Sequence, residues 1–271
     1  GKGSINKPAL GIYEYTPAKF TKTILIVGKG VTFDTGGYSL KSKKNHNDMK
    51  YDMCGAANCF AAFKTLVSAQ VPVKLILILP CVENTIGDKA ERPGDVYRAW
   101  NGKLVDVYNT DAEGRLILAD AIAYGTSTYK PDYCLDMATL TGGTTQIAAS
   151  MAGILCANEQ AENEINSLKK LARSLNEPML HLEILPEAAE NLKGNVSDYT
   201  NMHNKWGEGA ATMYAAAFLK SFLVGENVKW IHFDIANMAY APKYASYLNG
   251  QNASGFGART LREFIKILSQ N

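Results

Sequence analysis

Four acidic residues of this chain are placed where carboxylates could act together on a cation. They lie in three separate segments and are Asp34, Asp52, Asp111 and Glu113. If the last segment is extended, Asp111 and Glu113 point to the same side with only the methyl group of Ala112 between them. Two carboxylates so placed repel each other unless a cation lies between them. Such oxygen ligands suit Mg, Mn or Zn, so the set indicates a metal site that could activate water.

Each acidic segment also has a purely structural interpretation. Residues Asn109 to Asp111 precede an apolar helix, where such side chains commonly cap the first backbone amides, and the segment taken alone favours capping. Asp52 taken alone could equally be a solvated residue in the first turn of a helix. Lys41 opens the basic run 41–44 and, without further context, would be a solvated charge.

Other kinds of site fit the sequence less well. Gly28-Lys29-Gly30 follows a strand as a dinucleotide-binding loop would, but Phe33 stands where the third glycine is required. No nucleophile elbow of the type G-x-S-x-G is present, and no cysteine lies in a recognisable catalytic context. The histidines are scattered and are expected to be core or surface residues rather than ligands: His46, His181, His203 and His232.

The hydrophobic pattern predicts strands and helices in alternation around these segments. Buried strands are expected at 23–27, 73–79, 133–137 and 230–235, and helices at 50–69, 116–124, 161–175, 208–223 and 260–269. This alternation predicts one α/β domain, a three-layer αβα sandwich with a mainly parallel, mixed central sheet. Ligands of such folds lie beyond the carboxyl ends of the strands, which directs attention to loops 28–41, 80–95, 106–115 and 138–146.

Composition narrows the class of protein further. The 271 residues are 46% hydrophobic and 20% charged, as is ordinary for a globular chain, and a net charge of +2 gives no electrostatic case for a nucleic-acid or membrane partner. Five widely spaced cysteines without a C-x-x-C pair predict reduced thiols and a cytoplasmic location. The first residues contain no apolar segment of a signal peptide. The uncharged stretch 137–158 is too rich in threonine and glycine to span a bilayer.

The segments that contain the acidic residues resemble the two signatures of the leucyl (cytosol) aminopeptidase family of two-zinc exopeptidases. These segments are VGKGVTFDTGGYSLK at 27–41 and NTDAEGRLILADA at 109–121. Further similarity, such as ATLTG at 138–142 and HFDIA at 232–236, extends over nearly the whole chain. The resemblance implies that residues 1–271 are the family's C-terminal catalytic metallopeptidase domain, and that the N-terminal domain usual in the family is absent from this chain.

The resemblance also implies roles for the residues at matching positions. The tighter of two metal sites would take Lys29, Asp34, Asp52 and Glu113. The exchangeable site would take Asp34, Asp111 and Glu113. Lys29 would bind as the neutral amine, which a nearby dication favours. Lys41 would donate to the developing oxyanion, and Arg115 would hold a bicarbonate ion that serves as the base. The implied cofactors are two divalent metal ions, Zn²⁺ and/or Mn²⁺, together with bicarbonate.

The implied activity is release of N-terminal, preferentially apolar, Leu-like residues from peptide substrates. The pocket for the first side chain would be formed by Met49, Thr139, Leu140, Gly142, Ala236 and Ala239. Asn237 replaces the glycine usual after Asp-Ile-Ala and could add a polar edge to this pocket. Members of the family form homohexamers, so self-association is expected; Trp100, Trp206 and Trp230 are possible contributors, although burial in the core is expected for each. The alternative function is that of a DNA-binding or structural relative of the aminopeptidases, which the near-neutral charge disfavours.

Overall fold

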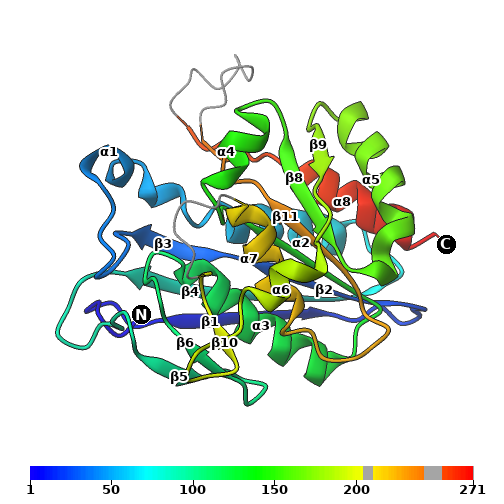
Figure 1. Cartoon of the computed structure of the whole chain (residues 1–271). Coiled ribbons are helices and arrows are strands. Elements are labelled where there is room, and N and C mark those ends of the chain that lie inside the picture. Colours follow the sequence, from blue (N-terminus) through cyan, green and yellow to red (C-terminus); the bar gives the residue numbers. More distant parts are fainter. Residues whose placement is uncertain (204–209, 241–251, 271) are drawn as a thin grey trace.

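A mixed sheet of eight strands forms the centre of the protein (Figure 1). The computed structural model describes residues 1–203, 210–240 and 252–270. The strands of this sheet are β1 (Ala9–Tyr15), β2 (Thr23–Gly28), β3 (Gly30–Asp34), β4 (Lys74–Asn84), β7 (Tyr133–Ala138), β8 (Gly153–Ala157), β9 (Met179–His181) and β11 (Lys229–Asp234). They follow the order β1-β4-β2-β7-β11-β8-β9, with β3 paired to β4. Only β1 with β4 and β8 with β11 are antiparallel pairs within this described sheet, so it is mainly parallel, as predicted.

Helices cover both faces of the sheet and complete the predicted three-layer sandwich (Figure 1). One face is covered by α2 (Cys54–Ser68), α5 (Glu162–Ser174) and α8 (Ala258–Leu268). The other is covered by α3 (Glu113–Tyr129), α6 (Pro186–Glu190) and α7 (Ala211–Lys220). The short helices are α1 (Lys43–His46) and α4 (Gly143–Ala148), with 3₁₀ turns η1 (Met49–Tyr51) and η2 (Glu159–Ala161). A second, small sheet contains β5 (Val96–Arg98), β6 (Leu104–Asp106) and β10 (Tyr199–Thr200).

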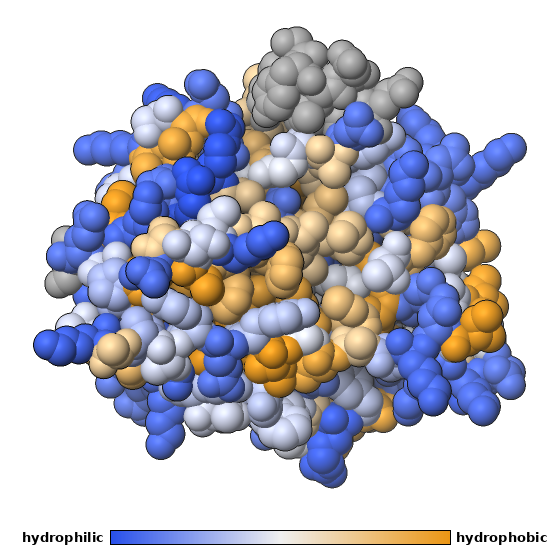
Figure 2. Space-filling model, turned by 180° about the vertical axis from the view of Figure 1, so that it is seen from behind, coloured by the Kyte–Doolittle hydropathy of each residue, from blue (hydrophilic) through white to orange (hydrophobic). Residues whose placement is uncertain are grey.

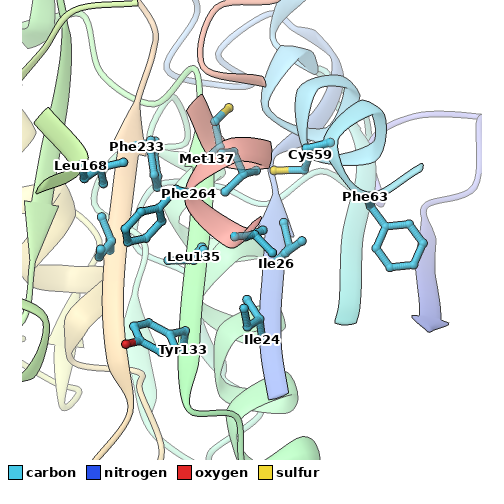
Figure 3. Packing of buried hydrophobic residues seen from close by; sticks show 14 of the residues in the cluster. Ile24, Ile26, Cys59, Phe63, Tyr133, Leu135, Met137, Leu168, Phe233 and Phe264 are labelled. Carbon is cyan, nitrogen blue, oxygen red and sulfur yellow. The ribbon is translucent and has the colours of Figure 1, made fainter. Parts of the chain in front are cut away.

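Strand β2 shows why a continuous apolar run predicts a strand buried on both faces. Successive side chains of a strand point to opposite faces, so Ile24 and Ile26 join the core beneath α2 and α8. Leu25 and Val27 instead join the core beneath α3 and α7. Figure 3 shows the first of these cores, where side chains of β2, β7 and β11 meet those of the covering helices. A strand with helices on both sides therefore has no polar face.

Each predicted strand and helix is present, with differences at the ends. Helix α3 begins at Glu113, three residues before the predicted start, and α7 begins at Ala211, while residues 208 and 209 lie outside the described part. The segment after Gly28, expected to be a loop, contains strand β3, and β4 does not end at Pro80 because β3 pairs with its continuation. Strand β1 was not predicted, since an edge strand with mostly exposed side chains lacks the pattern of a buried strand.

The uncharged stretch 137–158 does not form one long helix. It contains the end of β7, the six-residue helix α4 and strand β8. Among the described residues, no helix combines the length and the apolar character needed to cross a membrane. All five cysteines are free, in agreement with the predicted reduced thiols.

Candidate metal centre

The predicted acidic residues converge beyond the carboxyl ends of parallel strands. Asp34 is the last residue of β3, Asp52 directly follows η1, and Glu113 opens α3. One carboxylate oxygen from each of Asp34, Asp111 and Glu113 lies within 4.8 Å of the others, a separation that a single metal ion can bridge. Two chain segments far apart in the sequence thus supply this group of three carboxylates, as expected for this edge of an α/β sheet.

The ammonium group of Lys29 lies between the fourth carboxylate and this group. Its Nζ atom is 2.8 Å from Asp52 Oδ2 and 2.9 Å from Glu113 Oε1, and it donates to the carbonyl oxygen of Thr139 at 3.1 Å. Burial opposes the charge on Lys29, but the carboxylates of Asp52, Glu113 and Asp34 raise its pKa above the ordinary value. Asp52 is 4% exposed, so its interpretation as a solvated residue is wrong; burial raises the pKa of its carboxyl group.

Gly114 gives Lys29 the space to reach these carboxylates. A Cβ atom at position 114 would lie 2.6 Å from Lys29 Cε, which is closer than real Cβ contacts. Gly28 serves a different purpose, because a Cβ atom there would lie 2.6 Å from Ala56 Cα. The glycines next to the site therefore allow close packing of side chain and backbone, as the sequence suggested.

A second lysine pairs with the other side of the carboxylate group. Lys41 Nζ lies 2.7 Å from Asp34 Oδ2 and also contacts Asp111 Oδ1. The other oxygen of Asp34 accepts hydrogen bonds from the backbone N–H of Gly36 at 2.9 Å and from Asn84 Nδ2 at 2.8 Å. The Lys41 side chain is only 14% exposed, so it is not the solvated charge that its basic surroundings alone would suggest.

The capping interpretation of residues 109–111 is wrong. The N-cap of α3 is Ala112, and no side chain caps the helix. Asn109 Oδ1 accepts from the backbone N–H of Asp111, and Asn201 Nδ2 donates to the carbonyl oxygen of Asn109 at 2.7 Å. These contacts hold the segment so that the Asp111 carboxylate faces Lys41 and the site.

Arg115 lies in the first turn of α3, two residues after Glu113. It is 4% exposed, and its Nη1 donates to the carbonyl oxygen of Asn201 at 2.9 Å. Its Nε has no hydrogen-bond partner in the described part of the chain. Burial lowers the pKa of Arg115 to about 10, against the opposing charges of Glu113 and Asp234. Arg115 is not among the residues that line the pocket described next.

A cavity of about 430 Å³ lies beside the carboxylates and lysines. Five of the six predicted pocket residues line it, namely Met49, Thr139, Leu140, Gly142 and Ala236. The sixth, Ala239, is fully buried and is not among the lining residues. Lys44, Asp48, Tyr51, Thr141 and Thr145 also line the cavity and were not predicted to do so. The lining therefore combines the charged residues of the site with uncharged ones, of which Met49, Leu140 and Ala236 are apolar.

The donor set fits divalent cations. Four carboxylates share the site with two ammonium groups, which leaves a net negative charge when all of them are ionised. Oε2 of Glu113 is buried and has no hydrogen-bond partner within the described residues. Hard oxygen atoms with excess negative charge are the environment that Mg, Mn and Zn prefer.

Two further residues support the site and were not singled out from the sequence. Asn84 ends β4 and donates to both Asp34 Oδ1 and the carbonyl oxygen of Thr110. Asp234 ends β11 and accepts hydrogen bonds from the loop after β7. Asn84 lies within the loop 80–95 selected for its place after a strand, which is the signal that could have identified it.

Comparison with known proteins assigns the chain to a family. Residues 1–262 match the model described as the cytosol aminopeptidase family, catalytic domain. One relative is the probable cytosol aminopeptidase of Desulfotalea psychrophila, which is 40% identical over 98% of this chain and 52% of the relative. Another is the probable cytosol aminopeptidase of Chlorobaculum tepidum, which is 41% identical over 98% of this chain and 51% of the relative. The chain therefore spans about half the length of the curated relatives that it matches.

A similar solved structure is that of the bottromycin maturation enzyme BotP in complex with Mn. The TM-score is 0.89 at 32% sequence identity, and the match covers 99% of this chain and 58% of that chain. The fold, the motifs and the relatives thus indicate the same family over nearly all of the chain. This chain belongs to the cytosol aminopeptidase family.

Proposed function

We propose that this chain is the catalytic part of a metal-dependent aminopeptidase, a hydrolase that releases N-terminal residues from peptides. The observation that supports the proposal most strongly is the convergence of Asp34, Asp111 and Glu113 within 4.8 Å at the edge of a cavity. Membership of the cytosol aminopeptidase family and similarity to an enzyme solved with Mn support the same reaction class.

The ligands would divide between two metal positions. Lys29, as a neutral amine, would bind one ion together with Asp34, Asp52 and Glu113. The second ion would be bound by Asp34, Asp111 and Glu113. When bound, such ions lower the pKa of a coordinated water toward about 7 and supply hydroxide near neutral pH. Zn²⁺ and Mn²⁺ both suit these ligands.

Lys41 and Arg115 would assist the reaction without binding metal. Lys41 borders the cavity and would donate to the oxygen of the scissile carbonyl as negative charge develops there, an effect worth roughly 3–4 kcal/mol in other enzymes. Arg115 would hold a bicarbonate ion that accepts the proton of the attacking water. Its Nε, which has no hydrogen-bond partner among the described residues, and its place at the start of α3 support anion binding.

Metal dependence tests this proposal directly. Hydrolysis of leucine-p-nitroanilide is expected to stop after treatment with a chelator and to return on addition of Mn²⁺, because the proposed nucleophile is a water activated by metal. Asp111→Asn tests the same site by mutation, since it replaces one ligand oxygen with an amide nitrogen while keeping the size of the side chain. An active preparation in which elemental analysis finds no divalent metal would refute the proposal, and DNA binding without hydrolysis would favour the structural alternative.

We expect the enzyme to prefer apolar first residues, with Leu or Met best. The cavity wall formed by Met49, Leu140 and Ala236 carries no charge, and methionine adapts to varied apolar groups. Asp and Glu should be poor because their charge would be desolvated without a partner. Leu and Val should differ modestly, since one methylene is worth about 1–3 kcal/mol in such pockets. Aminoacyl-coumarin substrates measure this order, and faster turnover of Glu than of Leu would contradict the pocket assignment.

A further inference from the structure

The ammonium group of Lys41 lies on the oxygens that are proposed to bind the exchangeable metal. Its Nζ is 2.7 Å from Asp34 Oδ2 and contacts Asp111 Oδ1. The remaining oxygen of Asp34 already accepts hydrogen bonds from Gly36 and Asn84. The Asp34 oxygen that can face a cation is therefore the one that Lys41 holds.

An ammonium ion and a divalent cation compete for such oxygens. The ammonium group has three donors and no lone pair, so it cannot itself bind the metal while it is charged. Two cations on the same pair of carboxylates repel each other, and the repulsion is weakly screened where the side chains are largely buried. Lys41 and a metal ion bound to Asp34 and Asp111 therefore compete for these oxygens.

The surroundings of the two lysines differ in the freedom that they allow. Lys29 is enclosed, with its side chain 3% exposed and Gly114 directly against its Cε. Lys41 is 14% exposed and lines the 430 Å³ cavity. Its backbone N–H donates to the carbonyl oxygen of Thr35 at 2.9 Å, which anchors the main chain while the side chain can swing. Only Lys41, of these two, has space to move away.

We propose that Lys41 is a counter-ion of Asp34 and Asp111 that a metal ion can displace. It neutralises Asp34 and Asp111 until the exchangeable metal binds, and it then swings into the cavity. The second half of the inference rests on the proposed function: the same movement places the ammonium group where a substrate carbonyl would lie. Binding of the exchangeable metal is thus coupled to the position of Lys41, and the need to displace Lys41 lowers the affinity for that metal.

Equilibrium titration of the metal-depleted chain with Mn²⁺ tests the competition without any substrate. Lys41→Met keeps most of the side-chain volume and removes the charge, so Mn²⁺ should bind the weaker site about tenfold more tightly or better. Lys41→Arg keeps the charge and should bind no more tightly than the natural chain. Lys44→Met is the matched control, because Lys44 lines the same cavity but forms no ion pair among the described residues; a change below about threefold is expected.

A second measurement uses the natural chain and does not depend on the folding of a variant. Reductive methylation by formaldehyde, mapped by mass spectrometry, should modify Lys41 faster when Mn²⁺ is present, since the ion pair with Asp34 and Asp111 is then broken. Unchanged or weaker Mn²⁺ binding by folded Lys41→Met, or unchanged methylation, would overturn the inference. Tight Mn²⁺ binding without peptide hydrolysis would refute only the proposed function, whereas the absence of Mn²⁺ binding would refute both.

Discussion

The side chains of His232 and Asp136 form a fully buried ion pair outside the candidate site. His232 Nδ1 lies 2.6 Å from Asp136 Oδ1, and Trp230 Nε1 donates to the other oxygen at 2.7 Å. Burial opposes the charge on His232, but Asp136 raises its pKa above the ordinary value. His232 is thus a core residue, as the sequence suggested, and its imidazole is paired with a buried carboxylate.

Removing the carboxylate of this pair should destabilise the protein in a pH-dependent way. Asp136→Asn is expected to lower the free energy of unfolding by roughly 3–5 kcal/mol, because it leaves a buried imidazolium without its partner. The pKa of His232 is higher in the folded than in the unfolded chain. The stabilisation is therefore complete below the unfolded value of about 6.5 and is lost as the pH rises through the folded value.

Denaturant unfolding of both proteins at about pH 5.5 and about pH 9 measures this effect. The difference in the free energy of unfolding between the natural chain and Asp136→Asn should be larger at the lower pH. Equal differences at both values would show that Asp136 acts through neutral hydrogen bonds instead of the charge of His232.

The loop after β7 and the segment after β11 are joined by one buried carboxylate. Asp234 Oδ1 accepts from the backbone N–H groups of Leu140 at 3.1 Å and Ala236 at 3.2 Å, and Oδ2 accepts from Thr141 Oγ1 at 2.7 Å. Leu140, Thr141 and Ala236 all line the cavity. Asp234 therefore determines how two elements of the apolar wall lie relative to each other.

We expect Asp234→Asn to raise KM more than it lowers kcat. An amide cannot accept from the Thr141 hydroxyl and from the backbone N–H groups as a carboxylate does, so the wall that contacts the substrate should shift. The metal ligands are elsewhere, and the content of bound Mn²⁺ should not change. Asp136→Asn is the matched control, because Asp136 is equally buried but bonds to Trp230 and His232 instead of the wall. An unchanged KM for leucine-p-nitroanilide would contradict this assignment.

Asn237, which stands where glycine is usual after Asp-Ile-Ala, affects the end of α4 and not the cavity. Asn237 Nδ2 donates to the carbonyl oxygens of Ala149 and Ala152. Ala149 has a φ of +46°, a conformation that alanine rarely adopts. The Asn237 side chain thus holds a strained turn in place, and Asn237 is not among the residues that line the cavity. The polar edge that the sequence suggested for the pocket is directed to this turn instead.

The whole molecule exposes several large apolar side chains. They include Leu10 at 53%, Phe60 at 39% and Trp100 at 60%. The expected burial is thus wrong for Trp100 and confirmed for Trp230, while Trp206 lies outside the described residues. Figure 2 shows a band of hydrophobic residues across the middle of one face, between hydrophilic flanks. Contiguous apolar surface of this kind commonly marks a protein–protein contact.

We expect the chain to self-associate, with a homohexamer as the proposed state. Light scattering at micromolar concentration should give a mass that is a multiple of 29.5 kDa. Apolar contacts are not weakened by salt, so the mass should persist in about 1 M NaCl. A monomer mass under both conditions would refute assembly of this chain while leaving the proposed chemistry unaffected.

Local patterns in the sequence were sufficient to predict the sandwich and the residues of the centre. Strand β2 was predictable because burial on both faces requires an apolar residue at every position. Asp34, Asp52, Asp111 and Glu113 were identified because their motifs are specific. Edge strand β1 was not predictable in this way, since its exposed side chains leave no comparable pattern.

Only the tertiary structure decided what these residues contact. Lys41 could be a solvated charge or part of the site until its contact with Asp111, 70 residues away, was seen. Asn84 and Asp234 became supports of the site only because β4 and β11 end at the same edge of the sheet as β3 and β7. Such contacts depend on the order and register of strands that are distant in the chain. Hydrophobic periodicity reports which face of an element is buried, but it contains no information about which element lies beside it.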